Sequence, residues 1–217
     1  MQTMVEFAYR RVIDEISELS WRDLSEEEVI HTAWAYYFFS VQFRENLQIA
    51  RILHPEDEKL QDLEREECNT DNLSPWPGVA EVGERMDHDE FMKRVLSLEP
   101  ISEAKRSQFE EIGHRYLSKV DEMVFTTRAL SIASYEDGGL ERVFRAMLTA
   151  PPSDNPLVRG FRHFLSEHIR FDSDPAQGHG AMIRHLRPDD RILPLWTSFK
   201  DMLVEFAPGL ALSGHDK

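Results

Sequence analysis

The sequence predicts an all-α protein built as a single bundle of about seven or eight helices. Apolar residues recur at spacings of three and four along the whole chain, and this period is the main sequence signal of amphipathic helices. Strand signals, meaning apolar and polar residues in alternation between Asn-Gly or Asp-Gly turns, are nearly absent. Of the 217 residues, 41% are hydrophobic and 30% are charged. This mix suits one globular helical domain over residues 1–217.

Several helices and one long loop are expected in the first half of the chain. The motif Ser25-x-x-Glu28 is a capping box, which predicts the start of a long helix that ends at about Leu53. The centre of this helix is apolar on all sides, so we expect it in the middle of the bundle. The other expected elements are a helix over Met4 to Leu19, a short helix from about Pro55 to Cys68, a loop from Asn69 to Met86, and a helix from Asp87, capped by Asp87-x-x-Glu90, to about Leu98.

In the second half of the chain, Ser102 is expected to begin a long helix that runs past Tyr135 until Gly138-Gly139 breaks or bends it. The pair Asn155-Pro156 is typical of a helix start, because asparagine caps the helix and proline suits its first position. The remaining helices are expected over Leu140 to Leu148 and from roughly Arg191 to Glu205.

Charge and apolar patterning exclude several classes of partner. The chain has 25 basic and 40 acidic residues, a formal net charge of −15, which repels nucleic acid and anionic lipid surfaces. The longest apolar stretch, Val29 to Phe43, has about 15 residues and is too short to span a bilayer that needs about 20. We therefore expect neither nucleic acid nor membrane as a partner. The single cysteine, Cys68, and an N-terminus without the pattern of a signal peptide favour a cytoplasmic protein.

The helix that begins at Asn155-Pro156 ends its apolar face with two ionisable residues. Its stripe consists of Leu157, Phe161, Phe164 and Leu165, followed at the same spacing by His168 and Asp172. A carboxylate buried without a partner is costly, so Asp172 needs a cation, a hydrogen-bond network or exposure at the helix end. A divalent metal ion meets this need most directly. The alternative is that His168 and Asp172 pair with each other near the end of the helix.

Two further apolar stripes end in an acid. The stripe of Phe125, Ala129, Ile132 and Ala133 leads to Glu136, and the stripe of Leu60 and Leu63 leads to Glu67, for which Glu64 and Glu66 are competing choices. Three acids at the ends of apolar helix faces, together with a histidine, are typical of a carboxylate-bridged metal site inside a helical bundle. Carboxylate oxygens with a few imidazoles suit iron or manganese better than zinc.

With these motifs the sequence resembles the heme-oxygenase-like superfamily, which includes the thiamine-salvage aminohydrolases (thiaminase II), the pyrroloquinoline quinone synthase and the heme-oxygenase-like diiron oxidases. The resemblance covers most of the chain and is strongest over residues 168–180. This stretch looks like the third core helix of the family, in which a histidine is followed by an acid four residues later and then by another histidine. The resemblance implies a heme-oxygenase-like fold and, in the diiron branch, two iron ions per chain, with manganese as the alternative metal.

The resemblance also implies a set of metal ligands. These are Glu67 in Arg-Glu-Glu-Cys, His88 in His-Asp-Glu-Phe, Glu136 in Ser-Tyr-Glu-Asp, His168 with Asp172 on the third core helix, and His179 in Gly-His-Gly. The chain departs from the family pattern in the longer segment before His179, where Pro175 and Gly178 must break the helix, and in the longer loop before His88. His185 is the substitute candidate ligand. Cys68 lacks the context of the nucleophilic cysteine in the thiamine-cleaving members, so that activity is not expected.

The function that the resemblance implies is that of a non-heme diiron oxidase or oxygenase. Such an enzyme activates O2 to oxidise a small amino-acid-like or fatty-acid-like substrate in specialised biosynthesis, and homodimers are common among similar proteins. Arg128 or Arg170 is a candidate to hold a substrate carboxylate. Two alternatives stay open: a cofactor-free enzyme or binding protein for a small molecule, in which the same histidines and acids act as general acid and base, and a helical interaction domain without an active site.

Overall fold

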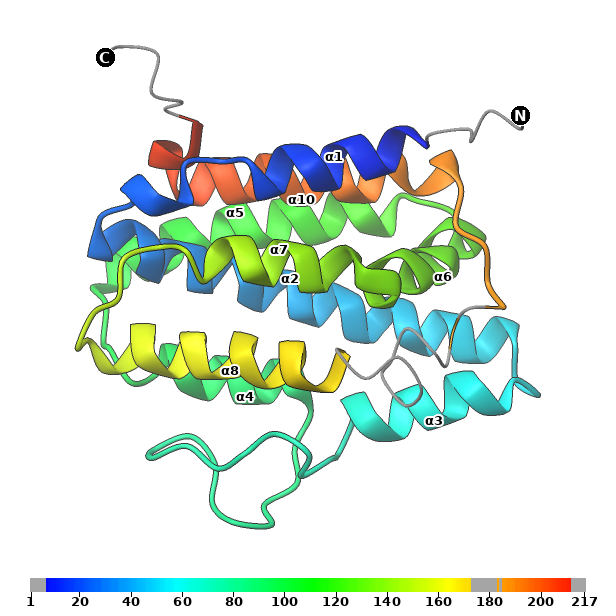
Figure 1. The fold of residues 1–217 in the computed structure, drawn as a ribbon, viewed down its shortest axis with the longest axis horizontal. Coiled ribbons are helices and arrows are strands. Elements are labelled where there is room, and N and C mark those ends of the chain that lie inside the picture. The colour runs from blue at the N-terminus through cyan, green and yellow to red at the C-terminus, as the bar shows by residue number, and fades with distance from the viewer. Residues whose placement is uncertain (1–6, 173–182, 184, 212–217) are drawn as a thin grey trace.

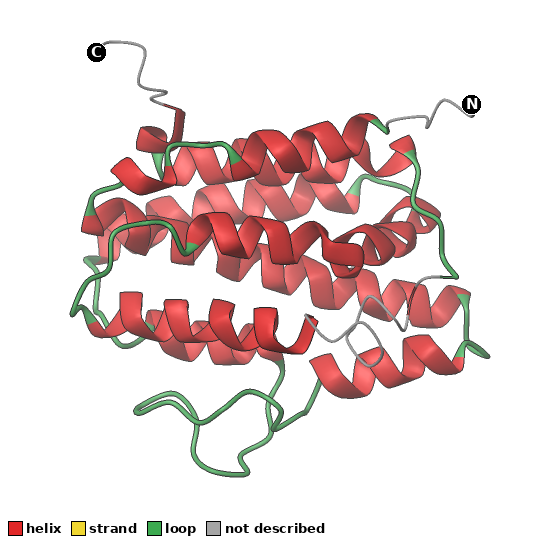
Figure 2. Cartoon of the chain, viewed as in Figure 1, coloured by secondary structure: helices red, strands yellow, loops and turns green. Residues whose placement is uncertain are grey.

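The computed structural model of the chain is a bundle of packed helices (Figures 1 and 2). The structure describes residues 7–172, 183 and 185–211, and the side chains of residues 171 and 172 are not part of that description. Within these residues, β-structure is limited to two isolated bridges, Thr70 with Met86 and Trp76 with Ala80, in the loop after the third helix. The predicted all-α class is therefore confirmed.

Of the connections that the structure describes throughout, the loop that precedes α4 is the longest. The bounds of the α-helices are α1 Ala8–Ser17, α2 Glu26–Leu53, α3 Glu58–Glu67, α4 His88–Leu96, α5 Glu103–Asp121, α6 Phe125–Ser134, α7 Leu140–Met147, α8 Pro156–Asp172 and α10 Leu193–Phe206. The short elements are η1 Trp21–Asp23, η3 Asp190–Ile192 and η4 Pro208–Ala211, which are 3-10 turns, and η2 Tyr135–Gly139, a wide turn of the π type between α6 and α7.

Helix α2 lies at the centre of the bundle and contacts α3, α4, α5, α6, α8 and α10. It begins at the predicted capping box, in which the Glu28 amide donates to Ser25 Oγ and the Ser25 amide donates to Glu28 Oε2. Its aromatic residues form the middle of the core. The Tyr36 ring packs against Phe144 of α7 and Phe164 of α8, with ring centroids 5.4 and 5.5 Å apart. Helices α4 and α8 contact each other beside α2 (Figure 1), and this group of helices surrounds the site described below.

The helix starts at Ser102 and Asn155 are as predicted. Ser102 Oγ accepts from the Lys105 amide, and Asn155 Oδ1 accepts from the amides of Leu157 and Val158. The prediction of a capping box at Asp87 is wrong, however. Asp87 is the N-cap residue of α4 without a side-chain bond to the helix, because its Oδ1 instead accepts from the Asn69 amide across the loop, at 2.8 Å.

The long helix predicted from Ser102 past Tyr135 is also wrong. Helix α5 ends at Asp121, and α6 begins at Phe125 after Val124 takes an extended backbone with ψ 142°. No glycine or proline marks this break. Packing sets it instead, since α5 contacts both α2 and α10, whereas α6 packs on α2. Tertiary packing here overrides local helix propensity. Phe125 is consequently 60% exposed and does not belong to the buried stripe that leads to Glu136.

Among the described residues, no helix combines the length and the apolar character needed to cross a bilayer.

Candidate metal centre

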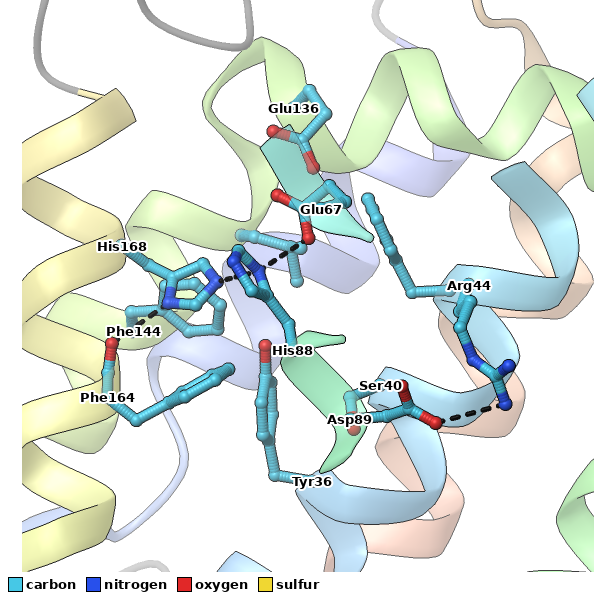
Figure 3. A pocket seen from close by; sticks show the side chains of 12 residues that line it. Tyr36, Ser40, Arg44, Glu67, His88, Asp89, Glu136, Phe144, Phe164 and His168 are labelled. Carbon is cyan, nitrogen blue, oxygen red and sulfur yellow. Dashed lines mark hydrogen bonds and ion pairs between the residues drawn. The ribbon is translucent and has the colours of Figure 1, made fainter. Parts of the chain in front are cut away.

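Three buried side chains from three helices meet in the interior between α3, α4 and α8. Glu67 is the last residue of α3, His88 is the first residue of α4, and His168 lies in the last part of α8. Glu67 Oε2 is 2.7 Å from His88 Nδ1, and His88 Nδ1 is 3.0 Å from His168 Nε2. One donor atom from each residue lies within 4.8 Å of the other two. This group has the residue types and the spacing to hold a metal ion (Figure 3).

Apolar helix faces bring these groups into the core, as the sequence pattern predicts. Leu60 and Leu63 precede Glu67 on α3 and are fully buried, and Glu67 itself is 6% exposed. The competing residue Glu64 instead accepts from Arg51 Nε at 3.0 Å. On α8, the ring of His168 packs against Phe164, with centroids 4.1 Å apart.

A backbone carbonyl fixes the tautomer of His168. Its Nδ1 lies 2.9 Å from the carbonyl oxygen of Phe164, and because a carbonyl oxygen only accepts, Nδ1 carries the hydrogen. In the neutral ring, Nε2 therefore carries the lone pair. That lone pair faces His88 and Glu67.

The tautomer of His88 is fixed by Asn72, a residue of the loop before α4. His88 Nε2 lies 3.0 Å from Asn72 Oδ1. The orientation of the Asn72 amide follows from its other contact, because Nδ2 is 2.7 Å from the carbonyl oxygen of Glu66 and must donate to it. Oδ1 therefore accepts from His88 Nε2. Neutral His88 thus presents the lone pair of Nδ1 to the interior.

Glu67, His88 and His168 thereby direct a carboxylate oxygen and two nitrogen lone pairs at one another. Acceptors at 2.7 and 3.0 Å repel each other unless a proton or a metal cation lies between them, and such repulsion is costly in the interior. The arrangement therefore requires an added proton or a metal cation. The proton can lie on one imidazole or on the Glu67 carboxyl.

Glu136 reaches the same cavity from η2. It is 6% exposed, and Figure 3 shows it extending toward the other three side chains. The backbone leaves helical geometry just after it, at Asp137 and at Gly138 with φ +85°. A Cβ at Gly139 would collide with the carbonyl oxygen of Ser134. The predicted break at the two glycines is therefore present, and it is a wide turn that carries an acid, as is common at functional sites.

The four side chains form one end of a small cavity. Its walls are apolar and aromatic, formed by Tyr36, Phe43, Leu140, Phe144 and Phe164. Its other end is polar and is lined by Ser40, Arg44 and Asp89. The cavity leaves about 20 Å³ for the centre of a water-sized sphere, which is room for a water molecule or an ion and little more unless side chains move.

The polar end contains an ion pair that is only partly satisfied. Arg44 Nη2 lies 3.1 Å from Asp89 Oδ2. Arg44 Nε and Asp89 Oδ1 are buried and have no hydrogen-bond partner among the described residues. Burial raises the pKa of the Asp89 carboxyl, whereas the charge of Arg44 and the backbone N–H groups of Asp89 and Glu90 oppose that rise. Buried polar atoms without a partner call for an explanation, and a ligand or a water molecule at this end of the cavity would supply one.

The structure thus brings together four of the six predicted ligands, namely Glu67, His88, Glu136 and His168. The side chain of Asp172 and all of His179 lie outside the described residues. The substitute candidate His185 is placed elsewhere: it is exposed, and its Nε2 is 2.5 Å from Asp57 Oδ2.

The two arginines proposed for a substrate carboxylate also lie away from the cavity. Arg128 pairs with Glu45 and Asp121, and Arg170 pairs with Glu167. Arg44 lines the cavity instead. The sequence signal for it is the spacing of four that joins Tyr36, Ser40 and Arg44 on one face of α2. The positions of Asp89, directly after His88, and of Asn72 in the loop carry no comparable signal.

In comparisons with known proteins, no family model, no curated protein and no solved structure matched this chain.

Proposed function

We propose that this protein is a non-heme diiron oxidase or oxygenase that activates O2 to oxidise a small organic substrate, either amino-acid-like or fatty-acid-like. The observation that carries the proposal is the convergence of Glu67, His88 and His168 on one buried point with their lone pairs facing inward. Glu136 lines the same cavity. The heme-oxygenase-like family resemblance of the sequence supports the choice of iron and of O2.

The donor set suits iron or manganese. Two imidazoles and two carboxylates suit iron or manganese, whereas structural zinc sites favour sulfur and nitrogen. Glu67, His88, Glu136 and His168 would hold the metal, and the family pattern assigns Asp172 and His179 as further ligands. When bound, two ferrous ions supply electrons for the reduction of O2.

The surrounding residues of the chain would prepare the site for this chemistry. Asn72 and the Phe164 carbonyl orient the two imidazoles, which is the usual role of groups behind a metal ligand. The rings of Tyr36, Phe144 and Phe164 line the cavity and keep bulk water from it. A dry cavity strengthens electrostatic interactions and protects reactive species from side reactions.

Metal analysis tests the proposal. Anaerobic loading with ferrous iron should give about two iron ions per chain, and exposure to O2 should give a transient visible absorption band. Glu136→Ala and His168→Ala should each abolish the band. Matched controls are Glu141→Ala, which removes an acid paired with Arg145 just after η2, and His163→Ala, which removes a histidine on α8 whose Nε2 meets the Ser74 carbonyl.

A cofactor-free function is the second candidate, and the 2.7 Å contact between Glu67 and His88 supports it. A carboxylate that holds a histidine is also the pairing used in general acid and base catalysis. Iron well below one equivalent per chain, or iron binding that survives Glu136→Ala and His168→Ala, would contradict the oxidase proposal and favour this one.

A further inference from the structure

The polar end of the cavity carries two unpaired atoms of opposite hydrogen-bonding character. Asp89 Oδ1 is an acceptor and Arg44 Nε is a donor, and both are buried without a partner among the described residues. They belong to residues that already contact each other, because Arg44 Nη2 meets Asp89 Oδ2 at 3.1 Å. Asp89 is 9% exposed and lines the cavity. The two atoms together therefore form one incomplete site.

The charges at this end restrict what can complete it. Arg44 faces two carboxylates, Asp89 at 3.1 Å and Asp87 at 3.8 Å. A lone carboxylate would be attracted by Arg44 and repelled by these two acids, and a lone ammonium would experience the reverse. Ser40 uses its hydroxyl hydrogen for the carbonyl oxygen of Tyr37, at 2.7 Å, which leaves its oxygen as an acceptor. Figure 3 shows Arg44 joined to Asp89 beside Ser40, to the right of His88 and Tyr36, with Glu136 at the top of the view.

We propose that Ser40, Arg44 and Asp89 bind the head group of an α-amino acid, with the carboxylate accepting from Arg44 Nε and the ammonium donating to Asp89 Oδ1. The apolar walls then lead the rest of the molecule toward the histidines. This inference deepens the proposed function by choosing the amino-acid-like over the fatty-acid-like substrate. It rests on the proposed function, because only that function makes the histidines the place of reaction. Neither unpaired atom touches solvent, so entry requires a movement of Arg44, whose side chain is one third exposed.

Four small probes that differ only in the head group test the proposal. L-alanine carries both charges, propanoate and ethylamine carry one each, and propanamide offers a neutral donor and acceptor; all four add little bulk beyond the head group itself. Binding is measured by NMR titration of the metal-free, full-length protein, from the shifts of the Arg44 Nε–H and Asp89 amide signals. L-alanine should bind at least tenfold more tightly than each of the other probes.

Substitutions assign the binding to these residues. Asp89→Asn and Arg44→Gln should each weaken L-alanine binding at least tenfold while the rest of the spectrum shows a folded protein. The matched control is Asp87→Asn, because Asp87 is the other carboxylate near Arg44, at 3.8 Å from Nη1, yet does not line the cavity. The control should stay within twofold of the unaltered protein.

The outcomes separate this proposal from the proposed function. Equal or tighter binding of propanoate, ethylamine or propanamide, no saturable L-alanine binding, or the same loss in Asp87→Asn as in Asp89→Asn would overturn the amino-acid site. Because the titration uses metal-free protein, L-alanine binding that depends on Asp89 together with iron below one equivalent per chain would support the amino-acid site and contradict only the oxidase.

Discussion

His88 Nδ1 lies 3.0 Å from His168 Nε2, and each ring has its other nitrogen bonded to an oxygen acceptor. Two neutral imidazoles in this arrangement would place lone pair against lone pair next to the carboxylate of Glu67. The energetic consequence is that this buried point is stable only with a cation or an added proton. The acceptors behind the rings are therefore as important for the site as the ligand atoms themselves.

Asn72→Leu tests the role of the acceptor behind His88. The substitution removes the side-chain oxygen that accepts from His88 Nε2, so the ring can place its hydrogen on Nδ1 and lose its inward lone pair. We expect the affinity for Mn²⁺, measured by calorimetry, to fall about 10- to 100-fold. NMR spectra of the imidazole nitrogens in the metal-free protein should show loss of the Nε2–H form.

Asn72→Asp keeps an acceptor toward His88 but replaces the Nδ2 donor with an acceptor next to the Glu66 carbonyl oxygen. It should keep the Nε2–H form of His88 and lose less Mn²⁺ affinity than Asn72→Leu. Asp71→Ala, next to Asn72 but paired with Arg85 on the surface, should change neither. An Asn72→Leu variant with unchanged tautomer and unchanged affinity would show that the acceptor does not control the ring.

Gly139→Ala tests the wide turn that presents Glu136. A Cβ here would strike the Ser134 carbonyl and crowd Trp196, so η2 must shift. We expect a loss of about 1–3 kcal/mol in the free energy of unfolding, as for overpacking elsewhere, and a lower iron content after anaerobic loading. Urea denaturation measures the free energy of unfolding, and metal analysis measures the iron content.

The neighbouring Gly138 provides the control for that experiment. It has φ +85°, and a Cβ at this position would meet no neighbouring atom. Asparagine tolerates this left-handed backbone conformation better than most residues. Gly138→Asn should therefore cost no more than about 1–2 kcal/mol and keep the iron content. If both variants lose iron equally, the shape of the turn at Gly139 is not what positions Glu136.

Much of this fold follows from the sequence because local signals and packing agree. Ser25 caps α2 as its motif predicts, and the stripes ending at Glu67 and His168 are buried as far as those two residues. The break between α5 and α6 was not predictable, because it depends on which helices each segment packs against rather than on glycine or proline.

The candidate site was predictable only in part, for a similar reason. Glu67, Glu136 and His168 end apolar helix faces, so periodicity brings them inward. Asn72 and Asp89 have no such pattern, since their roles depend on distances across the fold, to His88 and Arg44. Periodicity identifies which helix face is buried, and it does not identify which loop residue lies behind a ligand.

The stability of the protein should depend on pH through His31. Burial lowers the pKa of its ring, with a further lowering from Lys105, against the Phe206 carbonyl and Glu27, which raise it. Because the folded pKa lies below the unfolded value of about 6.5, the unfolded chain binds the proton more readily. His31 should thus not reduce the free energy of unfolding above about pH 6.5. Below that value the free energy of unfolding should decrease as the pH falls, by at most about 1.4 kcal/mol per pH unit for this group.

His31→Gln isolates that contribution. Urea denaturation between pH 7.5 and pH 5 should show a shallower pH dependence in the variant than in the unaltered protein. The control is His114→Gln, which replaces a histidine that packs edge-on against Phe38 on a neighbouring helix. This variant should keep the pH dependence attributed to His31. Parallel curves for His31→Gln and the unaltered protein would contradict the assignment.

Cys68 should be unreactive in the folded protein despite its position next to Glu67. Burial, followed by the nearby charges of Asp87 and Glu67, raises the pKa of its thiol to about 12, and the thiolate is the reactive form. At pH 8, alkylation by iodoacetamide should therefore be on the order of a thousandfold slower than in the urea-unfolded chain, whose thiol has the ordinary pKa of about 8.5. Because the chain has one cysteine, the mass increase reports this thiol alone, and Cys68→Ser gives the blank. Equal rates in the folded and unfolded protein would show that the fold does not raise the pKa of this thiol.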